Sequence, residues 1–81
     1  MTEREFHRMF GALYWYALVF RGVSPGCMPN GAADSDLSFG SKGYGAVGYK
    51  QPLSQQQVYN YELKSLGFTT WERLKYLRKL Y

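Results

Sequence analysis

Apolar side chains recur at helical spacing near the start of the chain, from Phe6 to Phe10. Three- and four-residue spacing of this kind predicts a helix over about residues 2–11. Thr2 and Glu5 have the spacing of a capping box, in which a hydroxyl oxygen accepts from a free backbone N–H and the acid reaches back. The pattern and the cap therefore agree on where this helix begins.

The pattern changes after Gly11, which weakens a helix. From Leu13 onward, aromatic and β-branched residues follow one another at a density typical of a strand. We therefore predict a strand over about residues 13–21. One continuous helix as far as Phe20 is the alternative, because apolar residues keep helical spacing up to that point.

Turn-forming residues dominate the segment 22–43, which is rich in Gly, Pro, Asn and Asp. We predict one long loop there. Loops longer than about 12–15 residues are uncommon in compact domains and often functional.

Capping boxes and turn residues divide the remaining chain into four predicted elements. They are a glycine-weakened strand at 44–50, a short helix at 54–60 opened by Ser54 and Gln57, a strand at 61–64 closed by Gly67, and a final helix capped by Thr69 and Glu72. One face of the final helix carries the apolar side chains of Trp71, Leu74, Leu77 and Tyr81.

These elements predict a single α+β domain over residues 1–81. An N-terminal helix, a C-terminal helix and one short helix would pack on a three-stranded antiparallel sheet, with an all-α fold as the alternative. An exposed edge of the strand at 44–50 would be able to pair with a second copy, so a homo-oligomer is an open expectation.

The composition favours binding over catalysis. The chain has five Phe, eight Tyr and two Trp, but one Cys, one His and six acids. Cys27 with His7 is the one conceivable nucleophile and base pair, and nothing in their spacing brings them together. One Cys, one His and scattered acids do not make a tetrahedral metal site. We expect a non-enzymatic protein without cofactor or metal. A lone Cys also fits a reducing, cytoplasmic compartment.

Gly43, Gly45 and Gly48 match the letters of a dinucleotide-binding fingerprint. That motif needs a helix opening at its last glycine, so that backbone N–H groups face the pyrophosphate. Pro52 follows too soon for such a helix, so we interpret the segment as a glycine-rich strand or turn.

Consecutive aromatic residues point to a contact surface. On a strand, neighbouring side chains alternate between faces. A sheet covered on both faces would bury all of them, and otherwise at least one ring faces outward as a partner surface. Tyrosine is also favoured at interfaces. The predicted protein-binding residues are Tyr14, Trp15, Tyr16, Tyr44, Tyr49, Tyr59 and Tyr61.

The alternative partner is nucleic acid, since the net charge is +4. Most of that charge lies on the predicted final helix, at Arg73, Lys75, Arg78 and Lys79. Such a small DNA- or RNA-binding regulator would bind more weakly as salt increases. We expect no membrane partner, because the apolar run from Met9 to Phe20 is shorter than the roughly 20 residues that span a bilayer.

Three segments also carry a resemblance, namely residues 21–29, 44–54 and 61–63. Their sequences, RGVSPGCMP, YGAVGYKQPLS and YEL, resemble small accessory proteins carried by phages and plasmids. The resemblance implies a protein that binds and inhibits a host enzyme or a defence protein of the CRISPR or restriction type. It brings no catalytic signature with it.

Overall fold

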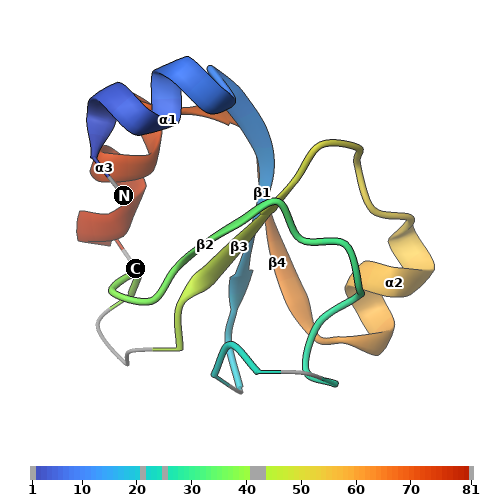
Figure 1. The fold of residues 1–81 in the computed structure, drawn as a ribbon. Coiled ribbons are helices and arrows are strands. Elements are labelled where there is room, and N and C mark those ends of the chain that lie inside the picture. The colour runs from blue at the N-terminus through green and yellow to red at the C-terminus, as the bar shows by residue number, and fades with distance from the viewer. Residues whose placement is uncertain (1, 21, 25, 41–43, 81) are drawn as a thin grey trace.

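The computed structural model describes residues 2–20, 22–24, 26–40 and 44–80. These residues contain three helices and four strands in an α+β arrangement (Figure 1). In chain order they are α1 (Glu3–Met9), β1 (Ala12–Leu18), β2 (Asp34–Asp36), β3 (Ala46–Tyr49), α2 (Gln55–Asn60), β4 (Leu63–Thr70) and α3 (Trp71–Leu80). The α+β class is confirmed, and the all-α alternative is wrong.

The four strands form one antiparallel sheet with the order β2-β3-β1-β4. The prediction of three strands missed β2, which lies inside the segment expected to be a loop. Because β3 lies between β2 and β1, it is not an edge strand. The predicted self-association through an edge at 44–50 therefore loses its structural basis.

Strand β1 divides the core into two layers. Leu13, Trp15 and Ala17 join the buried cluster under α1 and α3, together with Phe6 and Leu74. Tyr16 and Leu18 join the cluster on the opposite face, against which Val58 of α2 packs. Figure 1 shows α1 and α3 on one side of the sheet and α2 on the other. A sheet covered on both faces thus buries Trp15 and Tyr16 and leaves Tyr14 half-buried.

Gly11 ends α1 and turns the chain into β1. Its φ of +69° is a left-handed conformation that glycine adopts at little cost. Its N–H donates to the carbonyl of Phe6 at 3.1 Å, as is common after a helix C-terminus. The helix followed by a strand is therefore confirmed, and the single helix to Phe20 is wrong.

Strand β4 is longer than the sequence indicated, because Gly67 does not close it. Between Trp15 and Tyr16 the register with β1 shifts by one residue, a β-bulge at Leu66 and Gly67. Gly67 has a φ of +80°, which suits a bulge. The strand then continues to Thr70 and leads directly into α3.

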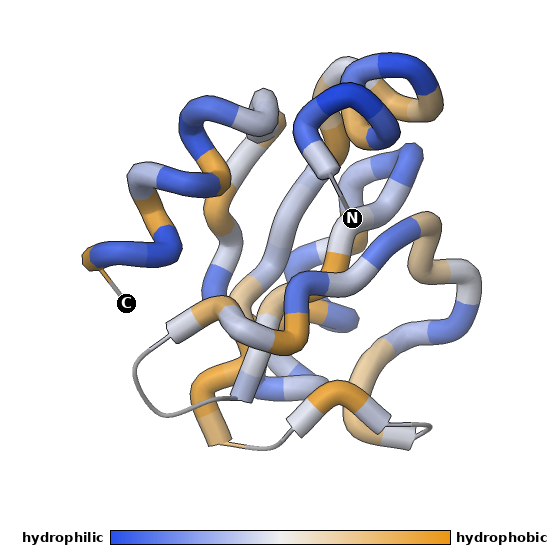
Figure 2. The backbone as a smooth tube through the Cα atoms, turned by 60° about the vertical axis from the view of Figure 1, so that its left-hand side comes forward, coloured by the Kyte–Doolittle hydropathy of each residue, from blue (hydrophilic) through white to orange (hydrophobic). Residues whose placement is uncertain are grey.

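The cap of α3 is one residue later than predicted. Thr69 is fully buried, and its hydroxyl donates to the carbonyls of Leu66 and Gly67 in the bulge. The hydroxyl oxygen of Thr70 instead accepts from the N–H of Arg73 at 3.4 Å. Along α3, hydrophilic and hydrophobic residues alternate (Figure 2), and its buried residues are Leu74 and Leu77.

Some expected features lie outside the described residues, namely Gly43, Tyr81 and Arg21 at the end of the first predicted strand. Within the described residues, no helix is both long enough and apolar enough to cross a membrane.

Candidate protein-binding groove

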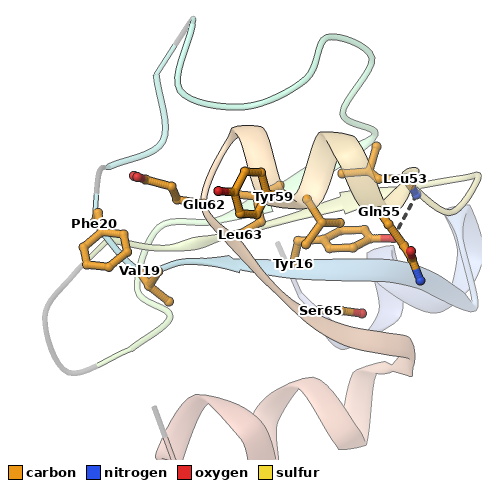
Figure 3. Close-up of a pocket in the computed structure, with 10 residues that line it drawn as sticks. Tyr16, Val19, Phe20, Leu53, Gln55, Tyr59, Glu62, Leu63 and Ser65 are labelled. Carbon is orange, nitrogen blue, oxygen red and sulfur yellow. Dashed lines mark hydrogen bonds between the residues drawn. The ribbon is translucent and has the colours of Figure 1, made fainter.

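An apolar groove of about 650 Å³ runs along α2 (Figure 3). Three parts of the chain form it: the end of β1 with the residues after it, the segment 53–62 that contains α2, and the start of β4. Its lining residues are Tyr16, Val19, Phe20, Leu53, Gln55, Val58, Tyr59, Glu62, Leu63 and Ser65. Most of these side chains are aliphatic or aromatic, as in binding sites for apolar groups.

The floor of the groove is part of the core. Tyr16 and Leu63 are buried, and Leu53 and Val58 pack against the same cluster. The Tyr16 hydroxyl accepts a hydrogen bond from the backbone N–H of Leu53 at 2.9 Å, drawn as a dashed line in Figure 3. This bond joins β1 to the segment before α2 and fixes that end of the groove.

Two large aromatic side chains project at the rim. Tyr59 is 82% exposed and Phe20 is 66% exposed. They belong to α2 and to the segment after β1, which are far apart in sequence and face the same groove (Figure 3). Exposed apolar side chains beside a formed apolar groove are characteristic of interaction sites.

Glu62 brings an unusual backbone conformation to the rim. Its φ is +55°, the one positive value that a non-glycine residue shows among the described residues. It follows the C-cap of α2, where glycine or asparagine is usual, and its N–H donates to the carbonyl of Tyr59 at 3.2 Å. A carboxylate is therefore held at the groove by a turn that most residues adopt at a cost.

The short helix α2 is positioned by its own sequence. Ser54 accepts from the N–H of Gln57 at 3.1 Å, and the Gln57 side chain accepts from the N–H of Ser54 at 3.1 Å. The predicted capping box is thus complete. Because the helix has only six residues, this box and the packing of Val58 hold Tyr59 over the groove.

Most of the predicted contact residues belong to the interior instead. Trp15, Tyr16 and Tyr49 are 0%, 4% and 4% exposed, so they do not present a surface to a partner in this conformation. Half-buried rings that pack against the core make up a second group: Tyr14, Tyr44 and Tyr61. Tyr59 alone of the predicted set is largely exposed.

The basic residues predicted to bind nucleic acid differ in whether their side chains are free to meet a partner. Arg73, Lys75 and Lys79 are exposed on α3. Arg78 is not available in the same way, because its guanidinium donates two hydrogen bonds to one oxygen of Asp36. The four side chains therefore do not act as one free cationic patch.

Cys27 and His7 are not brought together. Cys27 is half-buried against the cluster on the α2 face, where its sulfur accepts from the hydroxyl of Ser24 at 3.2 Å. His7 lies on α1, which covers the opposite face. The sheet therefore separates the thiol from the imidazole.

The glycine fingerprint has a structural explanation in the described residues. Gly48 lies in β3, opposite Trp15 of β1. A Cβ on Gly48 would lie 2.9 Å from Cδ1 of Leu13 and 3.0 Å from Cε2 of Trp15. Glycine is needed there to make room for the indole ring, and the strand leaves no helix N-terminus for a phosphate.

Two titratable groups that lie away from the groove rim have raised pKa values, because burial disfavours their charged forms. Desolvation raises the pKa of Tyr49 from 10.0 to about 12, and Tyr61 and Tyr16 add to the rise. The Tyr49 hydroxyl donates to the carbonyl of Pro29, which ties the loop to β3. Desolvation likewise raises the pKa of Asp34 in β2.

Several groove residues were absent from the predicted contact set, among them Phe20, Val58 and Glu62. Leu53 and Val58 have the spacing of a hydrophobic staple across the start of α2, and both pack against the same buried cluster. Nothing local in the sequence indicated that Phe20 would lie across from α2.

Comparisons with known proteins place the groove within a family segment. A family model described as "Defence against restriction A C-terminal" matches residues 11–68. All the residues that line the groove lie within that range. A search of curated proteins and a search of solved structures each found no match.

Proposed function

We propose that this chain, which belongs to the family Defence against restriction A C-terminal, counters restriction by binding a restriction protein through its apolar groove. The family match covers residues 11–68, more than half of the 81-residue chain. It fits the resemblance to accessory proteins of phages and plasmids. The binding partner and the inhibitory mechanism are our proposal.

The observation that carries the proposal is the pair of exposed rings at the groove. Tyr59 and Phe20 expose 82% and 66% of their surface and both line the groove, whose floor is buried and apolar. A partner that places apolar side chains in the groove and against its rim would bury both rings. Full burial of one such side chain is worth about 1.5–3 kcal/mol, enough for these residues to dominate a small interface.

The proposed mechanism is occlusion without turnover. The chain would cover a surface that the restriction protein needs for cutting or translocating DNA. Inhibition would then saturate when one chain is present for each binding site, whereas an enzyme would act at far lower ratios. A DNA cleavage assay with increasing amounts of the purified chain distinguishes the two.

The biological test compares restriction in cells that express variants of the chain. We expect the wild-type chain to increase the survival of unmodified DNA in a restricting host. Tyr59→Asp places a charge in the groove and should abolish the effect. Tyr76→Asp is the matched control, because Tyr76 is 62% exposed but lies on α3, outside the groove and the family segment. Equal protection by both variants would refute a role for the groove.

DNA or RNA binding by α3 has less support as the main function. Arg78 is bound to Asp36. The family match ends at residue 68, before α3 begins at Trp71.

A further inference from the structure

Three potential metal ligands meet on the side of the sheet opposite to the groove. Glu3 and His7 lie one turn apart on α1, and Glu72 lies in the first turn of α3. Nε2 of His7 is 3.7 Å from Oε1 of Glu3 and 3.5 Å from Oε1 of Glu72. One ligand atom from each residue lies within 4.8 Å of the others. Two of the six acids that looked scattered in the sequence, Glu3 and Glu72, thus lie beside the only histidine of the sequence.

We propose that Glu3, His7 and Glu72 bind a divalent transition-metal ion of the zinc type. Zinc takes imidazole nitrogen at about 2.0–2.1 Å and carboxylate oxygen at about 2.0–2.2 Å, so neighbouring ligand atoms of a tetrahedral site lie about 3.4 Å apart. The separations of 3.5 and 3.7 Å at His7 are close to that value. Small rotations of exposed side chains would complete the geometry.

The donor set selects the class of ion. One imidazole with two carboxylates suits zinc and its neighbours, whereas magnesium and calcium prefer oxygen ligands throughout. Two carboxylates also neutralise the charge of a divalent ion. Three protein ligands leave a fourth position for water or for a group from a partner.

The turns that carry these ligands are held in place by buried aromatic rings. Phe6, which precedes His7, is fully buried. Its ring lies 5.5 Å from the ring of Trp71, which precedes Glu72, and 6.4 Å from that of Trp15. The aromatic contacts fix α1 against α3, so the ligands approach one another before any ion binds. Such support by a rigid scaffold is what a metal site requires.

A pair of surface salt bridges would explain the same distances without a metal. The side chains of Glu3, His7 and Glu72 are 57%, 43% and 68% exposed, and exposed ion pairs contribute little. The two explanations differ in one respect that is easy to measure. Only a metal site links α1 to α3 through an added ion, and the stability of the fold therefore rises with the logarithm of the free ion concentration once the site is largely filled.

The test titrates zinc chloride into the full chain in metal-free buffer, by calorimetry, and follows thermal unfolding with and without zinc. We expect one ion per chain and an unfolding temperature that rises with zinc and returns on addition of EDTA. His7→Ala and Glu72→Gln should each weaken zinc binding about tenfold or more, because each removes a ligand. Glu5→Gln removes a carboxylate from the same helix outside the cluster and should bind zinc as the wild type does.

Cys27→Ser is the control for zinc binding by the thiol. We expect this variant to bind zinc with the wild-type affinity. Tyr59→Asp should also bind zinc as the wild type does. The proposal of partner binding at the groove and the proposal of zinc binding can therefore fail independently of each other. Three outcomes overturn the proposal: no zinc binding, unchanged affinity in folded His7→Ala and Glu72→Gln, or loss of binding only in Cys27→Ser. Circular dichroism of each variant establishes that it is folded.

Discussion

Arg78 donates two hydrogen bonds to Oδ2 of Asp36, from Nε at 2.9 Å and from Nη2 at 2.6 Å. The other carboxylate oxygen, Oδ1, accepts from the N–H and the hydroxyl of Ser38. Asp36 is 9% exposed and lies in the edge strand β2, while Arg78 lies in the last turn of α3. This pair therefore holds the polar edge of the sheet against the C-terminal helix.

Removing Arg78 should destabilise the fold. Arg78→Ala leaves the Asp36 carboxylate with Ser38 alone, and loss of one partner of a fully buried pair costs about 3–5 kcal/mol. The Arg78 side chain is 33% exposed, so we expect a smaller loss of about 2 kcal/mol. Urea denaturation measures it. Lys79→Ala removes the neighbouring, exposed cation and is the control. Its free energy of unfolding should stay within about 0.5 kcal/mol of the wild-type value. Similar losses in both variants would contradict the importance of the pair.

Gly48→Ala should destabilise the fold although it adds only one methyl group. The new Cβ would lie 2.9 Å from Leu13 and 3.0 Å from Trp15 inside the core. Overpacking of this kind typically costs about 1–3 kcal/mol. Gly22→Ala is the matched control, because nothing lies within 4 Å of its Cβ position. Thermal unfolding compares the two, and a Gly48→Ala protein as stable as Gly22→Ala would contradict the close packing.

Substitution by aspartate should be tolerated at Thr70 and strongly destabilising at Thr69. Thr70→Asp keeps an oxygen that accepts from the start of α3 and adds a favourable charge there, so stability should change by less than about 1 kcal/mol. Thr69→Asp buries a carboxylate at a fully enclosed position and should cost more than about 3 kcal/mol. Chemical denaturation of the two variants locates the cap, and the reverse ranking would place it at Thr69.

Stability should fall in strongly alkaline solution. Burial raises the pKa of Tyr49 from 10.0 to about 12, so between these values the unfolded chain loses a proton that the folded chain keeps. The free energy of unfolding then decreases as pH rises through this window, and the contribution is fully present below pH 10.

Tyr49→Phe is the control for that titration. It lacks the hydroxyl that donates to Pro29, so it should be less stable by about 1 kcal/mol at neutral pH. Its stability should also depend less on pH between 10 and 12. A Tyr49→Phe protein with the wild-type alkaline slope would show that other groups control this pH range.

Local signals predicted the helices best. The capping box of Ser54 and Gln57 requires only neighbouring residues, and it is complete in the structure. The cap of α3 was misplaced by one residue, because Thr69 and Thr70 have similar local chemistry. Which of them enters the core is decided by the bulge at Gly67, a feature of the pairing with β1.

Long-range contacts explain what the sequence did not reveal. Strand β2 consists of Asp34, Ser35 and Asp36, residues that favour turns. It is held by pairing with β3 and by Arg78 from the other end of the chain. No local pattern contains that information.

The candidate site shows the same limit. Whether Tyr16 or Tyr59 is exposed depends on the covering of the sheet by α2, which is a property of the assembled fold. The tyrosine content predicted that these rings contact a protein partner, but most of them pack inside the protein. The groove arises only when the end of β1 meets α2 and β4.

Recognition of a restriction protein by the groove is tested most directly by equilibrium binding of the purified chain to a panel of purified restriction enzymes. We predict that at least one enzyme binds the wild type and Tyr76→Asp with the same affinity, and binds Tyr59→Asp about tenfold or more weakly, since an apolar anchor is lost. A panel in which no enzyme binds the chain, or in which Tyr59→Asp binds as tightly as the wild type, would contradict the proposal that the groove recognises a restriction protein.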